Sequence, residues 1–570
     1  MKSSQLRKIF LEFFEKKGHK IVPPSSLIPA DPSVLFTTAG MQQFKLYYLG
    51  EPCPFGKNVA SCQKCFRTSD IAEVGDERHL TFFEMLGNFS FGGYFKKEAI
   101  EFAYQFLFEE LKLPLSNAFF TVFQGDEEVP EDKESFEIWQ KLGISKERIK
   151  KCSREDNFWG PTGLEGPCGP TTEIYVNGIE VWNLVFNEYY KDREGKLISL
   201  KQKGVDTGMG LERLAMISQN KNSVFETDLF EPIIKVLSTS NIEHQTSNIR
   251  SQRIIADHIK GAVFLISEGI LPSNVERGYV LRRILRRAIL HSKILNLPKN
   301  SMIEAAKKVI EIYKNVYPEV LSRQADVLTV IEGEREKFEK TLEKGLKKIK
   351  LQISNCKLKN EKILPGEIVF DLFQSYGFPL EITKEIAKEE GLEVNEKDFK
   401  ERFKKHQEIS RVGAEKKFGG VGKVTDYNMI KLHTATHLLH AALREILGEK
   451  VRQMGSDITP ERLRFDFSFD RKLTEEEIKK VEGLVNQKIK EDLEVNREEM
   501  NLKDALKSGA LAFFKEKYPE MVTVYTIGDF SKEICAGPHV KRTSELGIFK
   551  IKKEESAGRG IRRIYAILVK

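Results

Sequence analysis

Two pairs of metal-type side chains, far apart in the sequence, constrain the fold of this chain more than any other feature. The first pair is His433 and His437, and the second is Cys535 and His539, with a Gly-Pro step between its members. Histidines four residues apart on a helix point the same way, so both imidazoles can reach one ion. The Gly-Pro step excludes a helix at the second pair and indicates a loop or a strand end. The last part of the chain should therefore bring a helix and a loop together.

The donor set of these two pairs favours zinc. Three imidazoles and one thiolate are borderline-soft ligands that suit Zn²⁺. Thr434 stands where a zinc peptidase has its general-base Glu, so a peptidase site is not indicated. The alternative is a packed pair of core histidines with a buried cysteine. Cys62 and Cys65 also have zinc-knuckle spacing, but without a second pair nearby we interpret them as ordinary thiols.

Length and composition indicate a multidomain globular protein. A chain of 570 residues is too long for one core, and three or four domains are expected. The net charge of +7 is modest, and the seven cysteines form no legible disulfide framework. Because we find neither a secretion signal nor an apolar run of membrane-spanning length, we expect a cytoplasmic protein with no membrane contact.

The pattern along the chain predicts an α+β protein built from separate domains. An apolar repeat at helical spacing predicts an N-terminal helix, capped by Ser3 or Ser4 and ended by Gly18. Apolar strand-like runs among Gly/Pro loops, as far as about residue 215, predict an antiparallel sheet. The pattern then turns helical and basic. The predicted boundaries are 1–228, 229–410, a Gly-rich linker at 411–427, and an α+β domain at 428–570.

Three Arg- and Gly-containing stretches of the first domain indicate phosphate and ammonium binding. The first runs from Arg67 through Arg78 to Phe82-Phe83-Glu84 and beyond, the second spans 160–175, and the third spans 205–213. Glycine lets a backbone approach a ligand closely, and arginine offers a planar charged fork to phosphate. No Walker or Rossmann fingerprint is present. Taken singly, each residue is better explained as a surface charge or a turn.

Taken together, these stretches resemble a known family. Arg67, the Phe82-Phe83-Glu84 segment and the run from Gly208 to Arg213 resemble motifs 2 and 3 of class II aminoacyl-tRNA synthetases. The segments 89–96, 182–186 and 277–283, and the two metal-type pairs, are similar to alanyl-tRNA synthetases. The resemblance covers nearly the whole chain in family order. It implies a class II antiparallel-sheet catalytic domain, a helical tRNA-recognition domain and an α+β editing domain.

The resemblance also implies substrates and roles. ATP with Mg²⁺, alanine and tRNA(Ala) are the expected partners of a ligase that makes alanyl-adenylate and then alanyl-tRNA. The residues expected to carry catalysis are Arg67 on the α-phosphate, Asp206 on the alanine ammonium, and Arg213 on adenine and the γ-phosphate. The expected ATP site comprises Arg67, Arg78, Met85, Gly208 and Arg213. The expected alanine site comprises Trp159, Asn183, Val185 and Asp206.

Further positions match the family's RNA-reading and editing residues. Arg282, Arg283, Arg286 and Arg287 repeat at helical spacing, which fits either a solvated basic face or RNA contact. The resemblance favours RNA, because Asn274 matches a reader of the G3·U70 pair of tRNA(Ala). Gln374 stands where the second reader, an Asp, is expected. The expected tRNA-binding residues are Asn274, Arg282, Arg286 and Gln374. The expected editing site for Ser-tRNA and Gly-tRNA contains Thr436, Gln453 and one zinc ion on His433, His437, Cys535 and His539.

The chain also departs from the family pattern. No β-barrel segment precedes the histidine pair, and the chain ends soon after His539. We therefore expect a monomer. Two alternatives are a deacylase whose synthetase half has decayed and a non-catalytic RNA-binding paralogue. The presence of Arg67, Asp206 and Arg213 argues against the first, and the intact metal ligands argue against the second.

Overall fold

The computed structural model describes residues 1–570 except 32, 239–245, 406–425, 513–519, 559 and 570. The chain divides into two compact units, Met1–Phe399 and Lys400–Lys570. Within the described residues, no helix is both long enough and apolar enough to cross a membrane. Most of the predicted linker at 411–427 lies outside the described residues.

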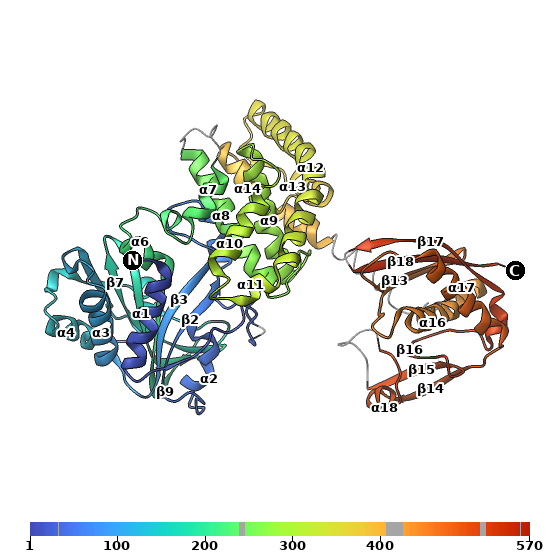
Figure 1. The fold of residues 1–570 in the computed structure, drawn as a ribbon, viewed down its shortest axis with the longest axis horizontal. Coiled ribbons are helices and arrows are strands. Elements are labelled where there is room, and N and C mark those ends of the chain that lie inside the picture. Colours follow the sequence, from blue (N-terminus) through green and yellow to red (C-terminus); the bar gives the residue numbers. More distant parts are fainter. Residues whose placement is uncertain (32, 239–245, 406–425, 513–519, 559, 570) are drawn as a thin grey trace. The chain divides into compact units, whose positions relative to one another are not determined.

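A nine-stranded sheet organises the first unit (Figure 1). Its order is β1-β2-β3-β9-β8-β7-β4-β5, with β6 paired to β7. The central pairs from β2 to β4 are antiparallel, and only the outer pairs β1–β2 and β4–β5 are parallel, which confirms the predicted antiparallel sheet. The strands are β1 (Lys20–Ile21), β2 (Asn58–Phe66), β3 (Phe82–Phe91), β4 (Ala118–Phe123), β5 (Ile149–Cys152), β6 (Phe158–Trp159), β7 (Gly166–Val176), β8 (Ile179–Lys191) and β9 (Leu197–Gly210).

The N-terminal helix α1 (Ser3–Lys16) begins differently from the prediction. The N-cap is Lys2, and neither serine caps the helix through its side chain. Instead, the Asp228 carboxylate accepts from the backbone N–H of Ser3 at 3.0 Å and from its hydroxyl at 2.6 Å. A distant carboxylate thus satisfies a helix-start donor, which sequence spacing alone cannot reveal. The predicted end is confirmed, since Gly18 has a φ of +83° just beyond the helix.

A helical segment follows the sheet as predicted (Figure 1), and it includes a short parallel pair of strands, β10 (Ile363–Leu364) and β11 (Glu393–Val394). Within it, α8 lies against β3, where the rings of Phe82 and Phe264 stack at 3.8 Å. Beside the sheet in sequence are α2 (Lys45–Tyr48), α3 (Lys96–Tyr104), α4 (Lys133–Lys141), α5 (Arg154–Asn157) and α6 (Leu211–Ser218). The later helices are α7 (Glu231–Leu237), α8 (Thr246–Ser267), α9 (Glu276–Ile294), α10 (Ser301–Tyr313), α11 (Pro318–Ser322), α12 (Gln324–Leu358), α13 (Gly366–Tyr376) and α14 (Leu380–Glu389).

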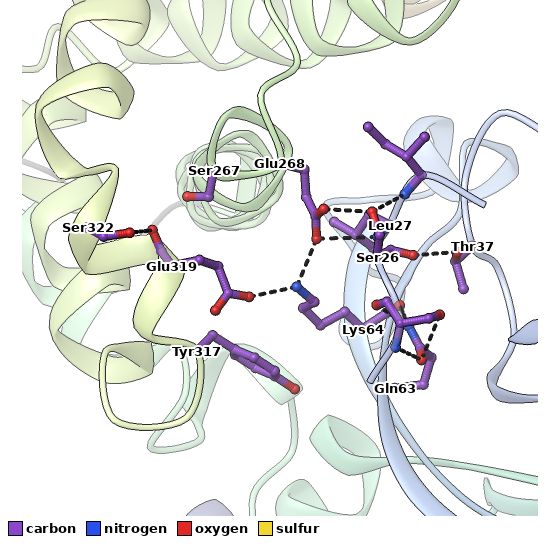
Figure 2. Close-up of polar contacts among 12 residues, drawn as sticks. Ser26, Leu27, Thr37, Gln63, Lys64, Ser267, Glu268, Tyr317, Glu319 and Ser322 are labelled. Carbon is purple, nitrogen blue, oxygen red and sulfur yellow. Dashed lines mark hydrogen bonds and ion pairs between the residues drawn. The ribbon is translucent and has the colours of Figure 1, made fainter. Parts of the chain in front are cut away.

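A buried lysine ties the sheet to these helices. Lys64 of β2 donates to Glu268, directly after α8, at 2.8 Å and to Glu319 of α11 at 2.7 Å (Figure 2). Its side chain is only 6% exposed, so removing either carboxylate would leave a poorly solvated charge. The strand that leads into Arg67 is therefore held by the helical segment.

The second unit has two sheets and two long helices (Figure 1). One sheet has the order β12-β13-β18-β17 and the other β14-β15-β16. The elements are α16 (Tyr427–Leu447), α17 (Glu475–Lys490), α18 (Leu502–Lys507), β12 (Gln453–Thr459), β13 (Arg462–Ser468), β14 (Val495–Asn501), β15 (Met521–Ile527), β16 (Ser531–Ile534), β17 (Ile548–Gly558) and β18 (Ile561–Val569). The core between α16, α17 and the first sheet includes Leu438, Phe465 and Val485. Each unit combines helices and sheet, so the α+β class is confirmed.

Candidate active site and metal centre

A cavity of about 280 Å³ in the first unit lies over the central strands of the sheet. All residues predicted for the ATP and alanine sites line it, although they come from distant parts of the sequence. They are Arg67, Arg78, Met85, Trp159, Asn183, Val185, Asp206, Gly208 and Arg213.

Strand register explains part of this convergence. Val185 of β8 lies opposite Asp206 of β9, and Asn183 lies opposite Gly208. Residues two apart on a strand share a face, so these four positions form one block on one side of the sheet. A Cβ atom at position 208 would lie 3.0 Å from the Sδ atom of Met85. Glycine at position 208 therefore leaves room for the Met85 side chain beside the cavity.

Asp206 is a buried carboxyl group of the cavity that has no cationic partner among the described residues. Asp206 is 5% exposed, and its burial raises its pKa to about 8. Because a buried carboxylate without a cation is costly, this position favours a positively charged ligand. Val185 and Trp159 add apolar surface at the same cavity. The arrangement suits a small ligand with an ammonium group.

Two half-buried guanidinium groups supply positive charge to the cavity. Arg67 donates through Nε to the carbonyl oxygen of Thr38 at 3.3 Å, and its guanidinium lies 5.0 Å from the centre of the Phe83 ring. Arg213 donates through Nη1 to Glu180 at 2.8 Å. Planar, permanently charged forks of this kind match phosphate oxygens. The cavity therefore combines sites for an anion and for a cation.

The two metal-type pairs meet in the second unit. His433 and His437 lie on α16, as the spacing predicts, while Cys535 and His539 follow β16. One potential ligand atom from each residue lies within 4.8 Å of all the others. The Sγ atom of Cys535 is 3.4 Å from Nε2 of His433.

The histidine rings are held through their other nitrogen atoms. Nδ1 of His433 lies 3.2 Å from the carbonyl oxygen of Pro538, and Nδ1 of His539 lies 3.2 Å from the Thr434 hydroxyl. Nδ1 of His437 contacts the buried carboxylate of Glu533. The Nε2 atoms of His437 and His539 are buried without a hydrogen-bond partner among the described residues. Because the outer partners hold Nδ1, these unpartnered Nε2 atoms can present a lone pair to a metal ion.

The electrostatics of the cysteine agree with this fit. Burial opposes ionisation of Cys535, but its hydrogen bond with His433 and the nearby charge of His437 outweigh that effect and lower the thiol pKa to about 2. A thiolate is the form that binds zinc. Among the described residues, this cluster is the one group with such ligand geometry. Cys62 and Cys65 are buried in β2 and form no disulfide.

Comparison with known proteins identifies the family of both parts of the chain. The model described as tRNA synthetases class II (A) matches residues 5–447, and the Threonyl and Alanyl tRNA synthetase second additional domain matches residues 522–565. A protein of Borrelia hermsii named alanine–tRNA ligase is 48% identical over 596 residues, covering 100% of both chains. This chain belongs to the alanine–tRNA ligase family. A protein of Treponema denticola, also named alanine–tRNA ligase, is 47% identical to this chain. The match covers 99% of this chain and 98% of that protein.

Alanine–tRNA ligases also include longer members. The protein of that name in Thermotoga maritima is 39% identical, and the match covers 100% of this chain and 80% of that protein. The family resemblance predicted from the motifs is confirmed. The second domain match contains Cys535 and His539 but not the α16 histidines.

The residues expected to read RNA have contrasting environments within the first unit. Asn274 is exposed just before α9, and its Oδ1 accepts from Arg282. Gln374 is exposed near the end of α13. Arg286 instead donates to Glu334 at 2.7 Å and to the carbonyl oxygen of Gly377, which ends α13. In this region, Asn274 and Gln374 are therefore accessible to solvent, whereas Arg286 stabilises the fold.

Arg287 departs from both interpretations of the basic row. It is 4% exposed and donates to Glu385 at 2.8 Å and to the carbonyl oxygen of Ile71 at 2.7 Å. Neither a solvated face nor an RNA contact describes it. Helical spacing placed it beside Arg286, but only tertiary packing decides which arginine of such a row becomes buried.

The residues expected at the editing site lie on α16 and β12. Thr436 is buried, and its hydroxyl donates to the carbonyl oxygen of Leu432 at 2.8 Å. Gln453 is half-buried at the first position of β12 and donates to the Ser456 hydroxyl at 3.1 Å. His440, which the motifs did not single out, contacts Glu533 at 2.7 Å. Glu533 therefore holds two histidines of α16.

Sequence reasoning also missed acidic residues of the ligase cavity. Glu173 and Glu180 line it together with Glu155, Asp156 and Glu212. Burial, followed by the charge of Glu180, raises the pKa of Glu173 to about 7. The available signal was a charged residue inside the otherwise uncharged strand β7, whose neighbours are buried.

Proposed function

We propose that this protein is an alanine–tRNA ligase that activates alanine with ATP and transfers it to the 3′-terminal adenosine of tRNA(Ala). One observation carries the proposal: a chain with full-length relatives of that name gathers its candidate ATP and alanine residues around one cavity. The reaction needs no protein nucleophile. Positioning of the alanine carboxylate against the α-phosphate, with neutralisation of charge, suffices for an in-line displacement.

In this proposal, arginines bind the nucleotide. Arg67 grips the α-phosphate, where negative charge develops as the carboxylate attacks and pyrophosphate leaves. Arg213 stacks on adenine and reaches the γ-phosphate, with Arg78, Met85 and Gly208 completing the site. ATP enters with Mg²⁺ as its usual partner. The half-buried position of Arg67 and Arg213 at the cavity supports these roles, since partial desolvation strengthens charge-assisted hydrogen bonds.

The amino acid occupies the other end of the cavity. Asp206 holds the ammonium group, and this cation supplies the missing partner of a buried carboxylate. Asn183, Val185 and Trp159 surround the small side chain. Larger amino acids are excluded by size, whereas glycine differs from alanine by one methyl group and a methylene is worth only about 1–3 kcal/mol. Serine is also rejected poorly by an apolar site.

A second activity corrects these errors. We propose that the second unit hydrolyses Ser-tRNA(Ala) and Gly-tRNA(Ala), with Thr436 and Gln453 lining the site. His433, His437, Cys535 and His539 would hold one zinc ion, whose Lewis acidity can orient and polarise the ester and water when it is bound. The match to the second additional domain of threonyl and alanyl tRNA synthetases supports this assignment.

RNA recognition is assigned to the helical segment of the first unit. Asn274 and Gln374 read the G3·U70 pair, and Arg282 contacts the backbone nearby. The exposure of Asn274 and Gln374 supports this role. Arg286, bonded to Glu334 and Gly377, would contribute by ordering the end of α13 behind Gln374. A contact between Arg286 and RNA is a prediction from the sequence. The cytoplasmic location and the monomeric state of the protein are also predictions from the sequence.

The direct test is alanine-dependent exchange of pyrophosphate into ATP by the purified full-length chain. We expect exchange with alanine, weaker exchange with serine and glycine, and none with larger amino acids. A deacylase with a decayed synthetase half and an RNA-binding paralogue both forbid any exchange. Charging of tRNA(Ala) by the same preparation then tests the transfer step.

A further inference from the structure

Asn183 has a buried oxygen atom with no partner. Its side chain borders the cavity, and among the described residues Oδ1 accepts no hydrogen bond. The Nδ2 atom of the same amide donates to Oε1 of Glu173 at 2.9 Å. An ionised carboxylate only accepts hydrogen bonds, so the amide nitrogen must face Glu173 and the amide oxygen must face away from it.

Glu173 is itself fixed by its neighbours. It lies directly opposite Asn183 in the β7–β8 register. The Tyr175 hydroxyl donates to Oε2 of Glu173 at 2.8 Å, which leaves Oε1 for Asn183. The Tyr175 ring is in turn stacked on Phe119 at 4.5 Å, with an interplanar angle of 9°. Tyr175, Glu173 and Asn183 thus form a hydrogen-bonded row, in which the donor and the acceptor of each bond are fixed.

Burial of the Glu173 carboxyl group lowers the stability of the fold. Glu173 is 7% exposed and forms no ion pair among the described residues. Its raised pKa of about 7 reflects this burial and the nearby charge of Glu180. A glutamine or an apolar side chain at position 173 would avoid the cost, so a purely structural role does not account for a carboxylate here.

We propose that Glu173 is a positioning residue for amino-acid recognition: it turns the Asn183 amide so that Oδ1 accepts a hydrogen bond from the ammonium group of the substrate. Asn183 and Asp206 lie diagonally on adjacent strands of one sheet face, so the two side chains offer two acceptors to one ammonium group. The inference rests on the proposed ligase function and extends it to residues outside the family motifs. Glu173 does not touch the substrate and acts only through Asn183.

The test is a double-mutant cycle in alanine-dependent exchange, run at pH 8, above the pKa of Glu173. Glu173→Gln retains shape but lets either end of the Asn183 amide face the cavity. We expect it to raise KM for alanine roughly tenfold, with KM for ATP changed less than about twofold. Asn183→Ala should raise KM for alanine at least as much. In the Asn183→Ala background, Glu173→Gln should have no further effect, because its partner is gone.

Glu180→Gln is the matched control. Glu180 is a second carboxylate of the same cavity, but it holds Arg213 rather than Asn183. Its substitution should alter KM for ATP more than KM for alanine. The same shift in both carboxylate variants would indicate a general charge effect and overturn the inference, as would independent, multiplicative effects of Glu173→Gln and Asn183→Ala.

A second variant guards against misfolding. Tyr175→Phe removes only the hydroxyl that fixes Glu173, and it should raise KM for alanine about two- to threefold with Asn183 present and not at all in Asn183→Ala. An equal rise in both backgrounds would contradict the positioning role. If wild-type protein shows no alanine-dependent exchange, the proposed function fails; if it exchanges normally but the cycles are additive, only this inference fails.

Discussion

The cavity of the first unit and the metal centre of the second unit hold charge in opposite ways. In the cavity, Asp206 is buried without a cation, and its pKa is raised to about 8 by that burial. In the metal-type cluster of the second unit, Cys535 is half-buried, and its histidine neighbours lower its pKa to about 2. The cavity thus lacks a partner that a cationic substrate can supply. The metal centre has its polar groups already oriented around one point.

The difference is the one expected between a site for exchangeable substrates and the proposed site for a resident ion. Outer partners fix Nδ1 of His433, His437 and His539, whereas Arg67 has one long hydrogen bond to Thr38. Imidazole rings that are held in one orientation favour tight metal binding. A guanidinium group that is held less firmly can move to contact a phosphate group. This contrast leads to the proposal that ligation and editing use separate machinery.

The largest expected effect comes from Arg67→Ala. Loss of the fork that neutralises the α-phosphate should cost on the order of 2–4 kcal/mol of transition-state stabilisation, or roughly 30- to 1,000-fold in exchange rate. Hydrolysis of supplied Ser-tRNA(Ala) should stay near the wild-type rate. Exchange within threefold of wild type would remove Arg67 from the ligation site.

Cys535→Ala tests the proposed metal site of the second unit. Removing one of four ligands should lower zinc content from about one ion per chain and slow Ser-tRNA deacylation on the order of a hundredfold. Alanine-dependent exchange should be spared. Metal analysis of the purified variant and of a chelator-treated wild type checks the expectation, and Cys356→Ala, at a free cysteine of the first unit, is the matched control. Normal deacylation by zinc-free protein would contradict the assignment.

Asn274→Ala separates RNA reading from both chemistries. We expect charging of a G3·U70 minihelix to fall about tenfold, because one base contact is worth about 1–3 kcal/mol, while exchange is unchanged. Replacing G·U by G·C should then harm wild type far more than the variant. Comparable losses in the two proteins would show that Asn274 does not read this pair.

Asp206→Asn is expected to act on the pH dependence of stability in the absence of substrate. The folded-state pKa of Asp206 is raised from 3.8 to about 8, so its contribution to stability is fully present below about pH 4 and is lost as the pH rises through 8. Relative to the variant, wild type should lose at most about 1.4 kcal/mol per pH unit across this window. Thermal unfolding at several pH values measures this slope, and parallel curves would show that Asp206 is not buried as a neutral acid.

Sequence spacing sufficed to group the four metal-type side chains but not the cavity residues. His433 and His437 share a helix face by periodicity alone, and the Gly-Pro step excludes a helix at the second pair. The cavity residues come from loops and strands whose proximity depends on register, such as Val185 opposite Asp206. The family resemblance, rather than any local pattern, predicted that they belong together.

Other features could not have been predicted because they depend on tertiary contacts. Asp228 replaces the expected serine cap of α1, and Arg287 is buried by Glu385 although its helical position resembles that of Arg286. Glu173 lies in the second of the three Gly-containing stretches without a predicted role, and only the strand pairing reveals that it faces Asn183. Helix and strand periodicity determine which side chains share a face. Residues distant in the sequence determine which charged side chain on that face is buried in an ion pair.

A crossed assay tests the separation of the two sites most directly. Wild type, Arg67→Ala and Cys535→Ala are each measured for alanine-dependent exchange and for hydrolysis of supplied Ser-tRNA(Ala). Our account predicts opposite losses: Arg67→Ala loses exchange and retains hydrolysis, and Cys535→Ala loses hydrolysis and retains exchange. Proportional loss of both activities in either folded variant would contradict it.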